Sequence, residues 1–290
     1  MKIAVFGATG TVGRALVERL RRDHDVVAVS RRGRPDEPGV RWAVADVGNP
    51  TAVRDAVDGM DVVYYLVHSL GTSDFADRDR RGAAIIARAA EGAGVEQIVY
   101  LGGLAPDDAE LSEHLRSRHE TEAVLRSGRV PVTAIGSAVV VGRGSAAFET
   151  IVALVDRLPA MVCPRWVSTP TQPIALDDVV GYLAAVCGLD AALDRSYQAG
   201  GPEVLTYRAM IEQIARIRGR RPLIVEVPVL SPRLSSYWLE IVTPVNAATA
   251  RPLIDGLRVP TVVTDFRLQE LAPQDLTPFA QAAEAALADR

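Results

Sequence analysis

Short apolar runs alternate with longer segments in which apolar residues recur at helical spacing. The short runs predict buried strands, and the longer segments predict helices. Alternation of this kind indicates right-handed crossovers, and therefore an α/β fold with a doubly wound parallel sheet covered by helices on both faces. Strands are predicted at 3–6, 26–29, 40–45, 61–67, 97–101, 131–135 and 196–200, and helices at 14–22, 51–57, 75–93 and 109–127.

A glycine-rich run, Gly7-Ala8-Thr9-Gly10-Thr11-Val12-Gly13, separates the first predicted strand from the first predicted helix. Glycines let the backbone approach a ligand closely, and a helix N-terminus offers unpaired N–H groups and a partial positive charge. A strand, a glycine turn and a helix in this order predict a Rossmann site for the diphosphate of a dinucleotide. The alternative is a tight turn without a ligand. The residues assigned to the cofactor here are Gly7, Thr9, Gly10, Thr11, Val12 and Gly13.

The regular alternation weakens after about residue 142, where prolines become frequent. We expect residues 1–145, completed by about 172–200, to form the dinucleotide-binding domain. Residues 146–171 and 201–290 are expected to form a smaller, irregular cap that binds substrate.

Ligands of such sheets bind beyond the carboxyl ends of the strands. The residues that follow the predicted strands are therefore candidates for the cofactor site: Ser30, Arg31, Arg32, Asp46, Val47, Val67, His68 and Gly102.

The end of the second strand indicates which nicotinamide cofactor is bound. An acidic residue there usually holds the ribose of NAD, but this strand ends in Ser30, Arg31 and Arg32. Guanidinium groups form charge-assisted bonds to phosphate, so the pattern favours the 2′-phosphate of NADP over a merely solvated loop. Asp46 could bind the adenine amino group, or it could cap the helix that begins near Pro50.

Charge and composition limit the classes of partner. The 290 residues carry a formal net charge of −4, which gives no electrostatic case for nucleic acid or an anionic membrane. Arg78, Arg80 and Arg81 alternate with acidic residues and are predicted to lie on an exposed helix face. The two cysteines match no metal spacing, so no metal site is expected, and a cytoplasmic protein with reduced thiols is the expectation.

Several further runs resemble the atypical branch of the short-chain dehydrogenase/reductase superfamily, and more narrowly its NmrA-like bacterial NAD(P)H-binding group. The resemblance covers nearly the whole chain and implies the Rossmann fold and a nicotinamide cofactor. The runs are Tyr65–Ser69, Tyr100–Leu104, His114–Arg118, Pro164–Trp166, Gln172–Val179 and Ser235–Trp238.

The catalytic pattern of that superfamily is absent here. Its Tyr-x-x-x-Lys pair aligns with His114 and Arg118, and its serine position falls on Gly102 or Gly103. Lys2 is the only lysine, so no lysine can occupy the helix. The resemblance therefore implies His114 as the candidate acid or base and Arg118 as the candidate ribose ligand.

His68 is the second candidate for catalysis, because it follows the fourth strand, where a nicotinamide ring lies in this fold. A nearby guanidinium favours the neutral form of an imidazole, so His114 would polarise a carbonyl by donating one N–H group. Each histidine could instead be a structural residue. Candidate substrate contacts are Ser69, Gly103, Arg165, Trp166, Tyr237 and Trp238, although Trp166 could simply pin its loop to the core.

Three functions remain open from the sequence. The first is an NADPH-dependent oxidoreductase that acts on a small carbonyl or conjugated substrate. The second is a non-catalytic NADP(H) sensor that binds a regulatory partner, and the third is an isomerase, epimerase or cyclase that retains the cofactor. The helices at 75–93 and 109–127 lie where the superfamily commonly forms homodimers.

Overall fold

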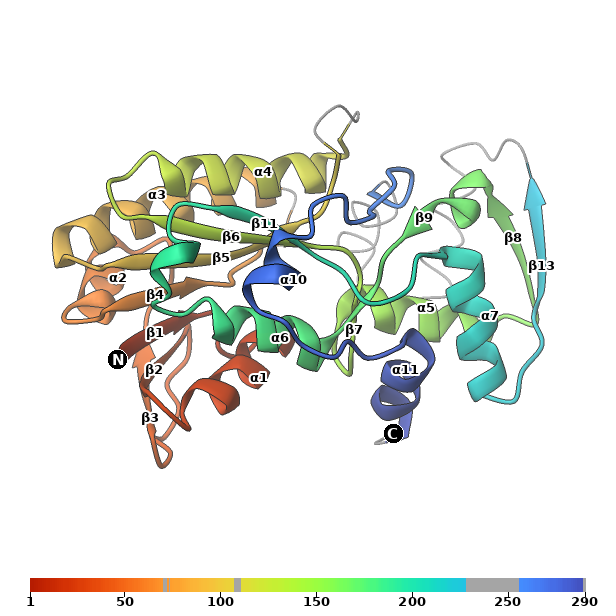
Figure 1. Ribbon diagram of the computed structural model, residues 1–290, viewed down its shortest axis with the longest axis horizontal. Coiled ribbons are helices and arrows are strands. Elements are labelled where there is room, and N and C mark those ends of the chain that lie inside the picture. The colour runs from red at the N-terminus through yellow and green to blue at the C-terminus, as the bar shows by residue number, and fades with distance from the viewer. Residues whose placement is uncertain (70–71, 73, 107–110, 228–255, 289–290) are drawn as a thin grey trace.

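The computed structural model describes residues 1–69, 72, 74–106, 111–227 and 256–288. Seven strands of the described chain form one parallel sheet, as the apolar runs predicted (Figure 1). They are β1 Lys2–Phe6, β2 Asp25–Ser30, β3 Val40–Val44, β4 Val62–Tyr65, β5 Gln97–Gly103, β6 Val132–Ser137 and β11 Ser196–Ala199. Their order is β11-β6-β5-β4-β1-β2-β3. The topology is therefore that of a doubly wound Rossmann sheet.

Helices cover both faces of the sheet (Figure 1). Side chains of β1 alternate between the two faces, so Ile3 and Val5 join one apolar core while Ala4 and Phe6 join the other. All four are at most 1% exposed, as expected for a parallel strand covered twice. The first core contains α1 Thr11–Leu20 and α6 Leu176–Ala185, and the second contains α2 Pro50–Val57, α3 Phe75–Ala93 and α4 Glu113–Arg126.

The direction in which strands are added reverses beside β1. From β1 the chain adds β2 and then β3 on one side, and it returns to add β4 on the other. At such a switch point the two connections leave in opposite directions, which opens a crevice beyond the carboxyl ends of the strands. The site described below lies at this edge.

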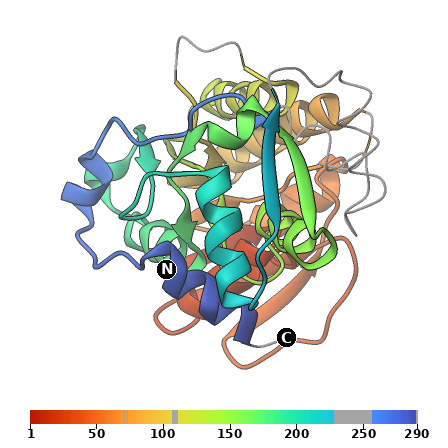
Figure 2. The ribbon, with the colours of Figure 1, turned by 90° about the vertical axis from the view of Figure 1, so that its right-hand side faces the viewer.

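A third apolar core lies away from the sheet, and Figure 2 views the molecule from this end. It packs residues of α5 Ala146–Arg157, α7 Tyr207–Ile217 and α11 Phe279–Ala288 with the strand pair β8 Ala160–Pro164 and β13 Leu223–Val227. These elements lie in the segments predicted as a cap. The remaining short elements are β7 Val140–Val141, η1 Arg165–Ser168, β9 Pro170–Thr171, β10 Ile174–Ala175, η2 Asp190–Ala192, β12 Leu205–Thr206 and α10 Arg267–Leu271.

One helix of the predicted cap segment packs on the main sheet instead. Leu268 of α10 is 1% exposed within the first sheet core, and α10 contacts β11. The division of the chain into a nucleotide-binding domain and a cap stays a prediction, with α10 belonging to the sheet side.

Several element limits differ from the prediction by a few residues, and two of these differences bear on the site. Strand β4 ends at Tyr65 rather than Val67, so the residues that follow leave the sheet early. Helix α4 begins at Glu113 because Ser112 caps it, with its Oγ accepting the Leu115 N–H group at 3.3 Å.

The turn between β1 and α1 brings two backbone segments into contact. Gly7 has φ of +87°, a conformation that side chains disfavour. A Cβ atom on Gly13 would lie 2.2 Å from the Gly7 carbonyl oxygen, so the first turn of α1 rests directly on the end of β1. Only glycine fits at either position.

We predict that Gly13→Ala destabilises the fold by about 1–3 kcal/mol, because backbone must shift to admit the methyl group. Urea unfolding monitored by circular dichroism measures the change. Gly92→Ala is the matched control, since Gly92 lies in α3 and a Cβ atom there would meet nothing within 4 Å. That control should be stabilising by up to about 1 kcal/mol. Equal stability of Gly13→Ala and the native chain would contradict the contact.

Candidate functional site

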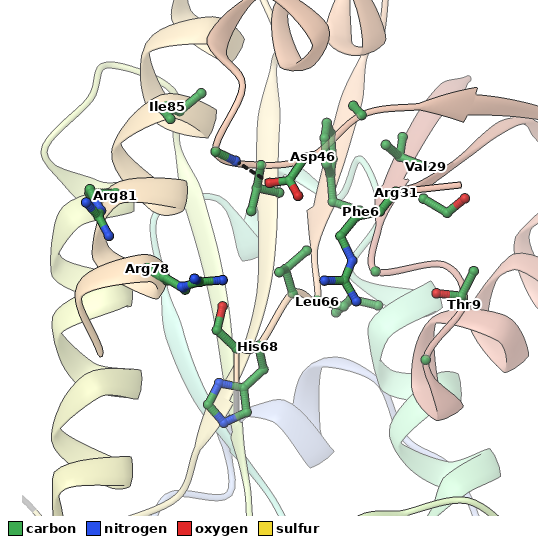
Figure 3. A pocket seen from close by; sticks show the side chains of 18 of the residues that line it. Phe6, Thr9, Val29, Arg31, Asp46, Leu66, His68, Arg78, Arg81 and Ile85 are labelled. Atoms are coloured by element: carbon green, nitrogen blue, oxygen red, sulfur yellow. Dashed lines mark hydrogen bonds between the residues drawn. The ribbon is translucent and has the colours of Figure 1, made fainter. Parts of the chain in front are cut away.

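A groove of about 830 Å³ runs along the carboxyl ends of β1, β2, β3 and β4. Its walls come from the glycine loop, the strand ends and α3 (Figure 3). Ten of the predicted residues line it: Gly7, Thr9, Gly10, Ser30, Arg31, Asp46, Val47, Val67, His68 and Ser69. Sequence reasoning therefore located the groove.

The glycine loop forms one wall and presents the start of α1. Gly10 is the N-cap residue, and no described side chain caps the helix. The N–H groups of Thr11, Val12 and Gly13 lie in this first turn, although these three residues are not part of the groove lining. Uncapped N–H groups beside a close backbone approach suit the diphosphate of a dinucleotide.

The end of β2 forms the second wall. Arg31 lines the groove, whereas Arg32 is exposed outside its lining. The Ser30 hydroxyl donates to the Arg32 carbonyl oxygen at 2.5 Å, which bends the chain after the strand. Of the two arginines, Arg31 is therefore the one placed to meet a ligand.

Asp46 does not cap the helix that follows it. Its Oδ1 accepts the Gly48 N–H group at 2.8 Å, while Asn49 caps α2 by accepting from Thr51 and Ala52. The capping alternative for Asp46 is wrong. Its carboxylate lies in the groove lining, opposite Arg81 and Ile85 of α3 in Figure 3.

Helix α3 contributes two arginines that the sequence analysis assigned to an exposed face. Arg78 and Arg81 are three residues apart, so both meet the groove, and Figure 3 shows Arg31 and Arg78 entering from opposite walls. The Arg78 Nε–H group donates a hydrogen bond to Asp74 Oδ2 at 2.8 Å. The i, i+3 spacing of Arg78 and Arg81 could have indicated that they share one helix face toward a ligand. The acidic residues between and beside them favoured the prediction of a solvent-exposed face instead.

The inner end of the groove holds a hydrogen-bonded network of two histidines and a buried carboxylate. Asp79 is 1% exposed, and its Oδ2 lies 2.7 Å from His68 Nδ1 while its Oδ1 accepts the Ser69 N–H group at 2.9 Å. His68 Nε2 lies 3.2 Å from His114 Nδ1. Residues of α3, α4 and the segment after β4 therefore meet at one point, and the sequence analysis missed Asp79.

The pKa values of all three groups are lowered from their ordinary values, and that of His114 is lowered most clearly. Burial raises the pKa of Asp79, but bonds from His68 and Ser69 with the charge of Arg118 outweigh it and leave that pKa low. Burial lowers the pKa of His68, although the bond to Asp79 opposes it. Burial, His68 and Arg118 lower the pKa of His114 to about 3. At neutral pH the carboxylate is ionised and both imidazoles are neutral.

Arg118 is buried beside this network rather than in the groove lining. Its guanidinium donates to the carbonyl oxygens of Val67 and Leu101 and lies over the ring of Tyr100. It thus ties β5 and the segment after β4 to α4. A direct ribose contact by Arg118 stays a prediction.

The remaining predicted residues that the structure describes are not part of the groove lining. Gly102 and Gly103 end β5, where a Cβ atom would meet the Tyr100 ring and the Leu115 side chain respectively. Arg165 is outside the groove lining, and Trp166 packs edge-on against Tyr207 in the third core, as the alternative interpretation of Trp166 proposed. Tyr237 and Trp238 lie outside the described residues.

No cluster of three or more histidine, cysteine, aspartate or glutamate side chains in the described ranges is arranged to hold a metal ion. No described helix is long and apolar enough to cross a membrane.

Comparison with known proteins supports this interpretation of the groove. Residues 7–139 match the model of the NAD(P)H-binding family. A Streptomyces griseus protein, (4-alkanoyl-5-oxo-2,5-dihydrofuran-3-yl)methyl phosphate reductase, is 27% identical over 286 residues, which cover 96% of this chain and 95% of the relative.

Two solved structures share the fold. The Citrobacter sp. triphenylmethane reductase complexed with NADP(H) has a TM-score of 0.78 at 20% identity, over 98% of this chain and 100% of that one. The Escherichia coli NADPH-dependent quinone oxidoreductase complexed with NADPH has a TM-score of 0.75 at 18% identity, over 98% and 99%. Residues 7–139 therefore resemble the NAD(P)H-binding family, and the two solved structures show the same overall fold.

Proposed function

We propose that this protein is an NADPH-dependent oxidoreductase that reduces a small carbonyl or conjugated substrate. The observation that carries the proposal is a single groove with three features. It has a glycine loop on one wall, an arginine instead of a carboxylate at the end of β2, and His68 at its inner end.

The residues present fit the cofactor. The turn from Gly7 to Gly13 leaves no room for side chains at its two ends and would hold the diphosphate, while Arg31 and Ser30 would hold the 2′-phosphate. Asp46 and Val47 would face the adenine, and Val67 and His68 the nicotinamide. When bound, NADPH supplies the hydride for the reduction.

The histidines would supply what the Tyr-x-x-x-Lys pair supplies elsewhere in the superfamily. A neutral imidazole can donate an N–H group to a substrate oxygen and polarise it. His68 lines the groove, and His114 adjoins it through the 3.2 Å contact. Of the predicted substrate contacts that the structure describes, Ser69 is the one that lines the groove, where it follows His68.

The name of the Streptomyces griseus relative supports the substrate class. That protein is named as a reductase of a dihydrofuran that carries oxo and alkanoyl groups, and it aligns with nearly the whole of this chain. A small conjugated carbonyl compound is therefore the first class to test. The segments 146–171 and 201–290 would supply its cover.

We predict that Arg31→Asp raises the Kd for NADPH on the order of 10- to 100-fold, because a charge-assisted contact to the 2′-phosphate becomes a repulsion. The Kd for NADH should change far less. Fluorescence titration of the purified protein with each cofactor measures both constants.

Arg88→Asp is the control for this experiment, since it makes the same change of charge on an exposed part of α3 outside the groove lining. It should leave both constants near those of the native chain. Equal weakening of NADPH and NADH by Arg31→Asp would remove the 2′-phosphate assignment.

We predict that His114→Ala lowers kcat by a factor of about 10²–10⁴, the range for loss of a general acid, without weakening NADPH binding. The assay is NADPH oxidation with a panel of aldehydes, ketones, enones and quinones. His119→Ala is the control, because His119 lies on the same helix outside the network. Bound NADPH without turnover on any class would favour the sensor function instead.

A further inference from the structure

We propose that Asp79, His68 and His114 form a proton relay that carries one exchangeable proton to the substrate, with Asp79 as the positioning residue that fixes both histidine tautomers. The use of the relay in reduction rests on the proposed function. Its hydrogen-bond arrangement does not, and can be measured without a substrate.

The buried carboxylate determines the first tautomer. The two oxygens of Asp79 have separate partners. Oδ1 accepts the Ser69 N–H group at 2.9 Å, and Oδ2 lies 2.7 Å from His68 Nδ1. An ionised carboxylate only accepts hydrogen bonds. His68 must therefore carry a hydrogen on Nδ1, which leaves Nε2 of its neutral ring as an acceptor.

The second tautomer follows from the first. His68 Nε2 and His114 Nδ1 are 3.2 Å apart, and a hydrogen bond at this distance needs one donor and one acceptor. Since His68 Nε2 accepts, His114 Nδ1 donates. His114 is then unprotonated at Nε2, so a carboxylate on α3 sets the state of a nitrogen on α4.

One added proton reverses the direction of the hydrogen bond between the two imidazole rings. A proton that binds His114 Nε2 lets the Nδ1 hydrogen of that ring move to His68 Nε2. His68 then holds the positive charge beside Asp79, and His114 is neutral with a hydrogen on Nε2. The pair accepts one proton only, because a second would place two cations with ring centroids 4.9 Å apart.

Once it has accepted this added proton, the relay is loaded, and it supplies the proton that reduction of a carbonyl or enone needs. NADPH, when bound, would supply a hydride and with it two electrons to the substrate carbon as the π bond breaks, and would be oxidised to NADP⁺. The oxygen, or the α-carbon of an enone, takes the proton from His114 Nε2. His114 Nδ1 is refilled from His68 Nε2, and solvent later returns one proton to the pair.

The surroundings place the charge on His68 rather than His114. His68 contacts Asp79 directly, its ring and that of Phe75 are in a T-shaped arrangement, and the Arg118 guanidinium acts on both imidazoles. The other titratable groups nearby are the buried phenols Tyr65 and Tyr100. Among these groups, Asp79 alone favours a cation. The rate of reduction should therefore fall as pH rises, because the histidine pair carries the added proton in a smaller fraction of the molecules.

Nitrogen-15 NMR of the histidine rings in the full native chain, without cofactor, is the first test. The chain has only four histidines to assign. At neutral pH we expect His68 and His114 both to be protonated on Nδ1 and unprotonated on Nε2. A hydrogen on Nε2 of either neutral ring would overturn the relay.

Asp79→Asn is the second test. The Ser69 N–H group would keep the amide oxygen as its acceptor, so the amide nitrogen would face His68 Nδ1 as a donor. Both tautomers should then invert to the Nε2–H form. We expect kcat to fall by a factor of about 10²–10⁴ and the pH limb of kcat to move to lower pH, since the cation loses its partner.

Asp77→Asn is the matched control, because Asp77 is exposed on the same helix and forms an ion pair with Arg80 outside the network. Native tautomers and native rate in Asp79→Asn would overturn the proposal. If that variant does not fold, the native-chain spectrum still decides. If no substrate is turned over, the proposed function fails while the spectrum reports on the relay separately.

Discussion

The contact of Gly13 with the Gly7 carbonyl is the constraint on which the site depends. Because neither residue has a side chain, α1 begins directly at the end of β1, and no side chain caps its first N–H groups. A methyl group at either position would separate helix and strand, and the groove wall would move with them. The opening of the groove is therefore a consequence of backbone geometry, with the strand order placing it at the switch point.

The second constraint is electrostatic. Burying Asp79 at 1% exposure is costly unless its charge is compensated, and here the compensation comes from His68, Ser69 and Arg118. Arg118 in turn donates to carbonyl groups of β5 and of the segment after β4. The inner end of the groove is thus held by one linked set of polar contacts among neighbouring strand ends and two helices, which keeps the histidines in a fixed arrangement.

Much of the fold followed from local patterns. The helix predicted at 75–93 coincides with α3, and every predicted strand of the main sheet is present, although β4 ends two residues early. The glycine loop and the residues after β2, β3 and β4 pointed to the groove, because strand ends converge in any parallel sheet. Arg165 and Trp166 were assigned to the substrate from their loop position and side-chain chemistry, and neither is part of the groove lining.

The sequence by itself determined the strands of the sheet and the glycine loop, because each rests on residues close together in the chain. Tertiary structure decided the chemistry at the inner end of the groove. In the sequence, Asp79 is one of several charged residues on a helix predicted to be exposed. In the structure, the packing of α3 against the sheet buries it. His68 and His114 are 46 residues apart, and only tertiary packing brings His68 Nε2 to 3.2 Å from His114 Nδ1. Periodicity records which face of a helix is apolar, but it does not record which buried polar groups meet.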